Sequence, residues 1–197
     1  MAENKAREVR RREILDAAMR CYSRKGYHAT TMDDITRESG LTKGGIYWHF
    51  KSKREIFLSM LHEHKKVHLA LWEKVEEIGA NENALIEGGL LFLREHINNE
   101  WLSNVFKEVE IEATRNEEVR RECLSMFDEI RQKIRELLKK AYGEGLIRKL
   151  DYESLTVILV ALIEGLITQY WLSGKKLDYG RIWRSFADTL LNGLLRK

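Results

Sequence analysis

The residues best suited to chemistry form one run, Lys-Gly-Gly-Ile-Tyr-Trp-His-Phe-Lys-Ser-Lys, from Lys43 to Lys53. Ammonium groups, a ring hydroxyl, an indole N–H and an imidazole N–H can all donate hydrogen bonds to phosphate oxygens. Two adjacent glycines weaken a helix by roughly 1 kcal/mol each relative to alanine, which folding alone does not explain. Because glycine lets a backbone approach a base edge or a phosphate closely, the run indicates a surface that contacts nucleic acid.

Two short helices must position this run. Thr31 is a candidate N-cap for the first helix, and the aspartates that follow it favour a first turn. Gly40 supplies the left-handed corner of a tight turn. Thr42 is a second N-cap, and residues 43–50 form the second helix. This arrangement is typical of a helix-turn-helix, whose second helix enters a DNA major groove.

The stretch from Ile14 to Phe57 resembles the N-terminal domain of TetR-family (tetracycline-repressor-type) transcription regulators, through the pattern Lys-Gly-x-x-Tyr-x-His-Phe-x-Ser-Lys. The resemblance implies that the Lys-Gly pair reaches bases and that the later Tyr, His and Lys hold phosphates. Trp48 stands where many members have tyrosine or another aromatic residue. The predicted DNA-binding residues are Thr31, Thr42, Lys43, Gly44, Gly45, Tyr47, Trp48, His49 and Lys53.

Composition predicts an all-α fold. The 197 residues include no proline and no convincing alternating strand pattern. We expect a three-helix DNA-binding domain over residues 1–52 and a larger helical bundle for effector binding and dimerisation over 53–197. Apolar periodicity predicts about nine helices, the later ones over residues 53–78, 84–97, 101–109, 119–142, 155–172 and 179–195.

Net positive charge is concentrated in the part of the chain that carries the helix-turn-helix. Residues 1–60 hold 13 Lys and Arg against 8 Asp and Glu, a net of +5, whereas the remainder holds 21 against 23, a net of −2. A positive patch on this part of the chain suits a DNA partner. The basic segment over residues 1–12 has two interpretations, a partly disordered solubilising tail or an arm that neutralises phosphates.

The segment over residues 155–172 is apolar on every side, so it must be covered on every side. In a chain of this length we expect a second copy to supply part of that cover, together with the apolar stripe of the last helix. The resemblance implies the same homodimer. The predicted interface residues are Leu155, Leu162, Gly165, Leu166, Tyr170, Trp183, Phe186 and Leu190.

Aromatic and apolar residues of the sixth to eighth expected helices could line a pocket for a small, largely apolar effector. Plain core packing explains most of them equally well, so both interpretations stay open. The candidate pocket residues are Trp101, Phe106, Glu110, Met126, Phe127, Leu159 and Ile163.

His62, His64 and His68 lie close together, and the last two are four residues apart, a spacing found among metal ligands. The order differs from His-Glu-x-x-His, and the sequence signals no third ligand. We therefore interpret them as histidines at the edge of the core and predict no metal and no cofactor. No nucleophile–base pair is signalled, so we do not expect an enzyme.

The sequence lacks a run of about 18 apolar residues and an apolar signal core near its start, so we expect a cytoplasmic protein. Cys21 and Cys123 are interpreted as buried thiols. The favoured function is a homodimeric transcription repressor, released from a palindromic double-stranded operator by a small effector. The alternatives are a DNA-binding protein without a ligand and, less favoured, a helical protein that binds metal through His62, His64 and His68.

Overall fold

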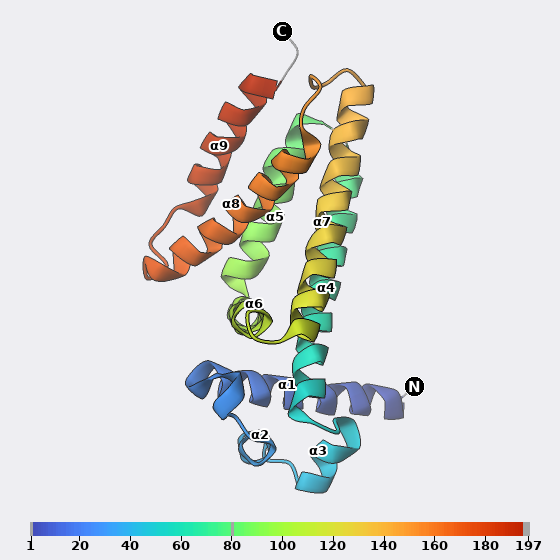
Figure 1. Cartoon of the computed structure of the whole chain (residues 1–197), viewed down its shortest axis with the longest axis vertical. Coiled ribbons are helices and arrows are strands. Elements are labelled where there is room, and N and C mark those ends of the chain that lie inside the picture. Colours follow the sequence, from blue (N-terminus) through green and yellow to red (C-terminus); the bar gives the residue numbers. More distant parts are fainter. Residues whose placement is uncertain (1, 80, 195–197) are drawn as a thin grey trace. The chain divides into compact units, whose positions relative to one another are not determined.

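The computed structural model describes residues 2–79 and 81–194, which form nine α-helices and no β-strand (Figure 1). The predicted all-α class is confirmed. The helices are α1 (Ala2–Ala29), α2 (Met32–Ser39), α3 (Lys43–His49), α4 (Lys53–Ile78), α5 (Glu82–Asn98), α6 (Glu100–Ala113), α7 (Glu117–Gly143), α8 (Tyr152–Leu172) and α9 (Tyr179–Leu194).

Packing divides the chain into two compact units. The first contains the residues up to Lys66 together with Trp101–Cys123, and the second contains Val67–Glu100 together with the residues from Leu124 onward. Helices α4 and α7 each contribute to both units. The boundary at residue 52 between a DNA-binding and an effector-binding part stays a prediction.

The first unit is built on the apolar stripe of α1. Ile14, Ala18 and Tyr22 are fully buried, and so are Ile35 of α2 and Ile46 of α3. Helix α1 contacts α2, and α2 contacts α3 (Figure 1). The three-helix packing that the apolar periodicity predicts is therefore present in this unit.

Helix α1 breaks where the sequence places its glycine. Gly26 has φ 79° and ψ 161°, a conformation that side chains with a Cβ rarely adopt. One further turn follows, up to Ala29. Gly26 thus interrupts the helix, and the short turn beyond it carries backbone carbonyls that accept hydrogen bonds from Lys53.

The basic N-terminal segment is helical from Ala2 onward, which differs from a partly disordered tail, while the arm that neutralises phosphates stays a prediction. The Arg7 guanidinium lies over the Trp48 ring, 5.1 Å from its centroid. Arg11 lies 4.5 Å from the centroid of the Phe50 ring and donates to Ser59 Oγ at 2.8 Å. These arginines therefore pack against α3 and α4 of their own unit.

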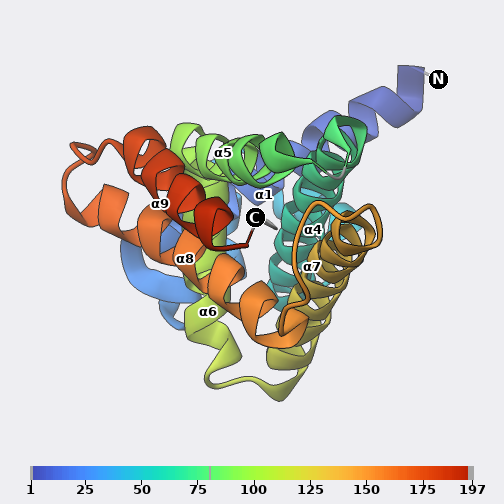
Figure 2. The same ribbon diagram turned by 90° about the horizontal axis from the view of Figure 1, so that it is seen from above.

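The core of the second unit surrounds Trp183. Helix α5 contacts both α8 and α9 (Figure 2). The indole Nε1 of Trp183 donates to the carbonyl of Ile86 at 2.9 Å. A Cβ added at Gly89 would lie 1.9 Å from the same ring, so only glycine lets the indole lie against α5. Trp183 is 1% exposed as a result.

This packing changes the predicted dimer interface. Trp183 and Leu166 belong to the core of their own protomer, so neither is available to a second copy. Gly165 is exposed. The other predicted residues are half-buried against the same core: Leu155, Leu162, Tyr170, Phe186 and Leu190. Cys21 and Cys123 are buried free thiols, as predicted.

Candidate nucleic-acid interface

Helix α2 begins with a reciprocal cap. Thr31 Oγ1 accepts from the N–H of Asp34 at 3.1 Å, and the Asp34 carboxylate accepts from the N–H of Thr31 at 2.8 Å. Lys25 also donates to Asp34 at 2.5 Å. Hydrogen bonds from Lys25 and then from Thr31 hold the pKa of Asp34 well below its usual value. The Thr31 hydroxyl thus supports the helix rather than standing free for DNA.

The turn into α3 follows the predicted chemistry. Gly40 is left-handed, with φ 69° and ψ 8°. Thr42 Oγ1 accepts from the N–H of Gly45 at 3.1 Å and so caps α3. Ile46 is fully buried and fixes the inner face of the helix. Helix α3 ends at His49, one residue earlier than predicted, because Phe50 is extended.

The outer face of α3 presents the residues that the sequence singles out for DNA. Lys43 and Gly44 are exposed, Tyr47 is 37% exposed and Trp48 is 61% exposed. Tyrosine and tryptophan are enriched at interfaces, so these two exposed rings suit a binding face. Lys43 Nζ pairs with Asp33 Oδ1 at 2.8 Å, so a contact from Lys43 to DNA must replace this exposed ion pair.

His49 is half-buried beside the arginines of α1. Burial lowers the pKa of His49, and the charges of Arg7 and Arg11 lower it further. The ring stays neutral near pH 7 and offers one N–H donor. Our sequence prediction did not place Arg7 beside this surface. Its spacing of four from Arg11 on one helix face was the signal that could have shown it.

Lys53 has a role other than the predicted phosphate contact. Its ammonium donates to the carbonyls of Tyr27 at 2.7 Å, Thr30 at 2.8 Å and His28 at 3.2 Å. It also lies 4.3 Å from the centroid of the Tyr27 ring. Three donated bonds use the three protons of an ammonium group. We therefore assign Lys53 to the support of the turn after Gly26.

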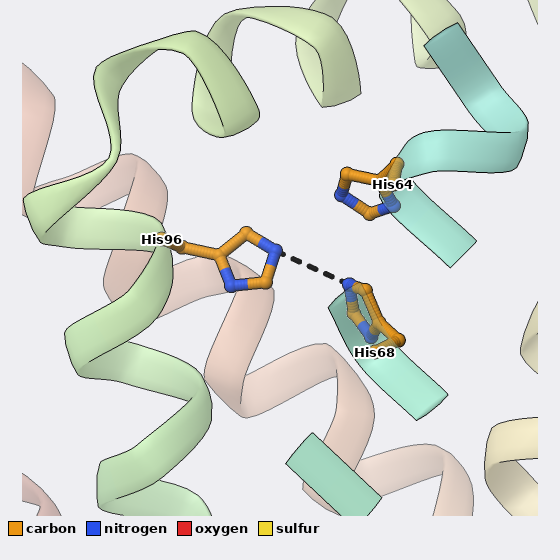
Figure 3. A group of neighbouring side chains, drawn as sticks. All are labelled: His64, His68 and His96. Atoms are coloured by element: carbon orange, nitrogen blue, oxygen red, sulfur yellow. Dashed lines mark hydrogen bonds between the residues drawn. The ribbon is translucent and has the colours of Figure 1, made fainter. Parts of the chain in front are cut away.

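The histidines separate into two groups. His62 is exposed, whereas His64 is fully buried and its ring stacks on Phe106 at a centroid distance of 5.1 Å. His68 Nε2 lies 3.2 Å from Nε2 of His96, a residue of α5 that the sequence did not suggest (Figure 3). The prediction grouped His62 with His64 and His68 because they are neighbours in sequence, whereas the structure groups His64 and His68 with His96.

The candidate effector residues fall in both packing units. Trp101, Phe106 and Glu110 belong to the first unit, where Arg12 lies over the Trp101 ring at 4.1 Å. Met126, Phe127, Leu159 and Ile163 belong to the second unit. Met126 and Leu159 are buried there and serve the core.

Comparison with known families agrees with this geometry. Residues 14–60 match the family of bacterial regulatory proteins described as the tetR family. Residues 94–196, about half of the chain, match the C-terminal family of BetI-type transcriptional repressors. The chain belongs to the TetR family. It is thereby a DNA-binding transcription regulator, and the predicted class of function is confirmed.

Individual relatives align with most of the chain. The chain is 30% identical over 149 residues to the uncharacterized HTH-type transcriptional regulator YfiR of Bacillus subtilis, covering 71% of this chain and 68% of that protein. It is 28% identical over 207 residues to the HTH-type transcriptional regulator TtgR of Pseudomonas putida, covering 93% and 90%. The solved structure of FadR from Bacillus subtilis in complex with stearoyl-CoA has the same fold, with a TM-score of 0.78, 21% identity and coverage of 92% and 97%.

Gly44→Ala separates folding from DNA binding. Beyond its chain neighbours and the backbone of its own helix, no described atom lies within 4 Å of a Cβ added at Gly44, so alanine fits the isolated protein and raises its stability by up to about 1 kcal/mol. The added methyl group would stand on the face of α3 that we predict to approach DNA. We expect affinity for a selected operator to fall about tenfold or more, measured by fluorescence anisotropy beside urea unfolding.

Gly143→Ala is the matched control, because its Cβ would also meet no described atom and it lies at the end of α7, outside this surface. It should leave DNA affinity unchanged. Parental operator affinity in Gly44→Ala would contradict a close backbone approach at this position.

Proposed function

We propose that the protein is a homodimeric repressor that leaves its operator when a small, largely apolar molecule binds its C-terminal helical region. The observation that carries the proposal is the match of residues 94–196 to BetI-type repressors, joined to a first unit that exposes α3. Residues 1–52 would bind DNA and residues 53–197 would bind the effector and the second copy. We expect such a protein in the cytoplasm, where its operator is.

In the proposed complex, the outer face of α3 enters the major groove. Lys43, Gly44 and Gly45 would approach base edges, while Tyr47, Trp48 and His49 would contact phosphates. A two-fold dimer presents two copies of α3, so the operator would be palindromic with half-sites about one helical turn apart. Thr31, Thr42 and Lys53 would act by holding α2, α3 and the preceding turn in place.

The outer side of α8 supports the dimer. Ile158 is 55% exposed and Leu172 is 76% exposed, with exposed Ala161 and Gly165 between them on the same stripe. By length and composition α8 is apolar enough to cross a membrane, and only 28% of its apolar window is buried. In a family of DNA-binding regulators, a second α8 is the partner that covers such a stripe. The small residues allow the two helices to approach closely.

Ile158→Glu tests this interface. A carboxylate at the centre of an apolar contact between copies would be buried without a partner, so we expect monomers in sedimentation experiments at concentrations where the parent is dimeric. Ile111→Glu is the matched control, since Ile111 is similarly exposed, at 51%, but lies on α6. A dimeric Ile158→Glu protein, or a monomeric parent, would rule out this face as the interface.

The candidate pocket residues suggest the chemical class of the proposed effector. They are mostly aromatic or aliphatic, and Glu110 is their polar member, so a largely apolar molecule would suit them. The FadR structure of the same fold holds stearoyl-CoA, a ligand with a long apolar chain. Long-chain acyl compounds are therefore the first probes to use in a thermal-shift screen, with coenzyme A as the matched control that lacks the chain.

Effector and operator should compete. Calorimetry with the compound that raises the melting temperature most, with and without saturating operator, measures the coupling. Linkage requires that the two affinities weaken each other by the same factor, and couplings are typically about 5–150-fold. Equal effector affinities in both titrations would contradict the proposed release mechanism, and would favour a DNA-binding protein that no ligand controls.

A further inference from the structure

His68 and His96 form a pair that the DNA-binding surface does not use. They come from α4 and α5 within the second unit, and their Nε2 atoms lie 3.2 Å apart (Figure 3). Phe92 lies beside His68 at a centroid distance of 5.4 Å, and Trp72 lies beside Phe92 at 5.7 Å. Two imidazoles thus face each other among aromatic rings.

A hydrogen bond fixes the tautomer of His96. Its Nδ1 lies 2.9 Å from the carbonyl oxygen of Phe92, which can only accept. Nδ1 therefore carries the proton, and Nε2, the atom that faces His68, presents a lone pair. Histidines that bind metal ions usually have this arrangement, with the distant ring nitrogen donating to a carbonyl or a carboxylate.

The separation of the two nitrogens suits one ion. Without an ion, the 3.2 Å separation is a hydrogen bond that His68 Nε2 donates to His96 Nε2. Two nitrogens at 2.0–2.1 Å from a tetrahedral zinc ion are about 3.3 Å apart, so an ion could take the place of this proton with little movement once the proton of His68 is on Nδ1. His64 lies one helical turn before His68 on α4, and a spacing of four places both on the same face of that helix (Figure 3). It is fully buried, so its imidazole is part of the interior.

We propose that His68 and His96, with His64 as the third ligand, bind one divalent transition-metal ion per protomer. Three imidazoles without a carboxylate favour zinc, copper or nickel over magnesium or calcium. Three protein ligands leave a fourth tetrahedral position to water or to a donor atom of a bound molecule. This inference goes beyond the proposed repressor function, because the ion would bind whether or not DNA or an organic effector is present.

The test uses tag-free, full-length protein that has been stripped with a chelator and dialysed. Titration with Zn²⁺ by calorimetry should show one ion per protomer, and Co²⁺ should give the intense visible absorption of a tetrahedral site. His68→Gln, His96→Gln and His64→Gln should each weaken Zn²⁺ binding about tenfold or more. His62→Gln is the matched control, since His62 is an exposed histidine of the same helix, and it should bind as the parent does.

Three results would overturn the proposal. In the first, the parent protein binds no Zn²⁺ and gives no tetrahedral Co²⁺ spectrum. In the second, His62→Gln weakens Zn²⁺ binding as much as His68→Gln does, and in the third, His64→Gln binds Zn²⁺ with full affinity. If circular dichroism shows that a variant of a buried histidine does not fold, the parent protein still tests the proposal. Its histidine Hε1 resonances must shift in NMR spectra when Zn²⁺ is added. None of these readouts involves DNA, so they are independent of the repressor function.

Discussion

The ammonium group of Lys53 holds the backbone turn on which the DNA-binding helices depend. Helix α1 breaks at Gly26, and the turn that follows ends at Ala29, so its last carbonyls lack the partners that a continuing helix would supply. Lys53, the first residue of α4, donates to three of these carbonyls. The end of α1 is thereby fixed to the start of α4, and α2 and α3 are the segment of chain held between them.

The same turn also contacts α6 of the first unit. The N–H of Tyr27 donates to Glu108 Oε2 at 3.3 Å, and His28 Nε2 lies 2.8 Å from Glu112 Oε2. Glu112 is 3% exposed, and burial raises the pKa of Glu108. A movement of α6 must therefore change contacts at the turn that Lys53 holds. Helix α6 also contributes three of the candidate effector residues, namely Trp101, Phe106 and Glu110.

Local features of this structure could be predicted from the sequence, whereas contacts between distant segments could not. The caps of Thr31 and Thr42 and the corner at Gly40 depend on a few neighbouring residues, so residue type and spacing indicate them. The place of Trp183 against α5 and the pairing of His68 with His96 depend on how separate helices pack. No local pattern shows that a lysine expected at a phosphate instead caps carbonyls more than twenty residues earlier. The sequence was therefore least informative about which partner a long side chain contacts.

The most direct test of this account is the melting temperature of Lys53→Met compared with Lys51→Met. Lys51 is an exposed lysine nearby that donates to the Tyr47 carbonyl at 2.8 Å, so its loss should change the melting temperature by about 2 °C or less. Losing the Lys53 cap should cost about 2–3 kcal/mol, which corresponds to a fall of roughly 4–12 °C for a chain of this size. Binding to operator and to non-specific DNA should weaken together. An unchanged melting temperature, with a salt dependence of DNA binding reduced by about one unit, would make Lys53 a phosphate contact and contradict the account.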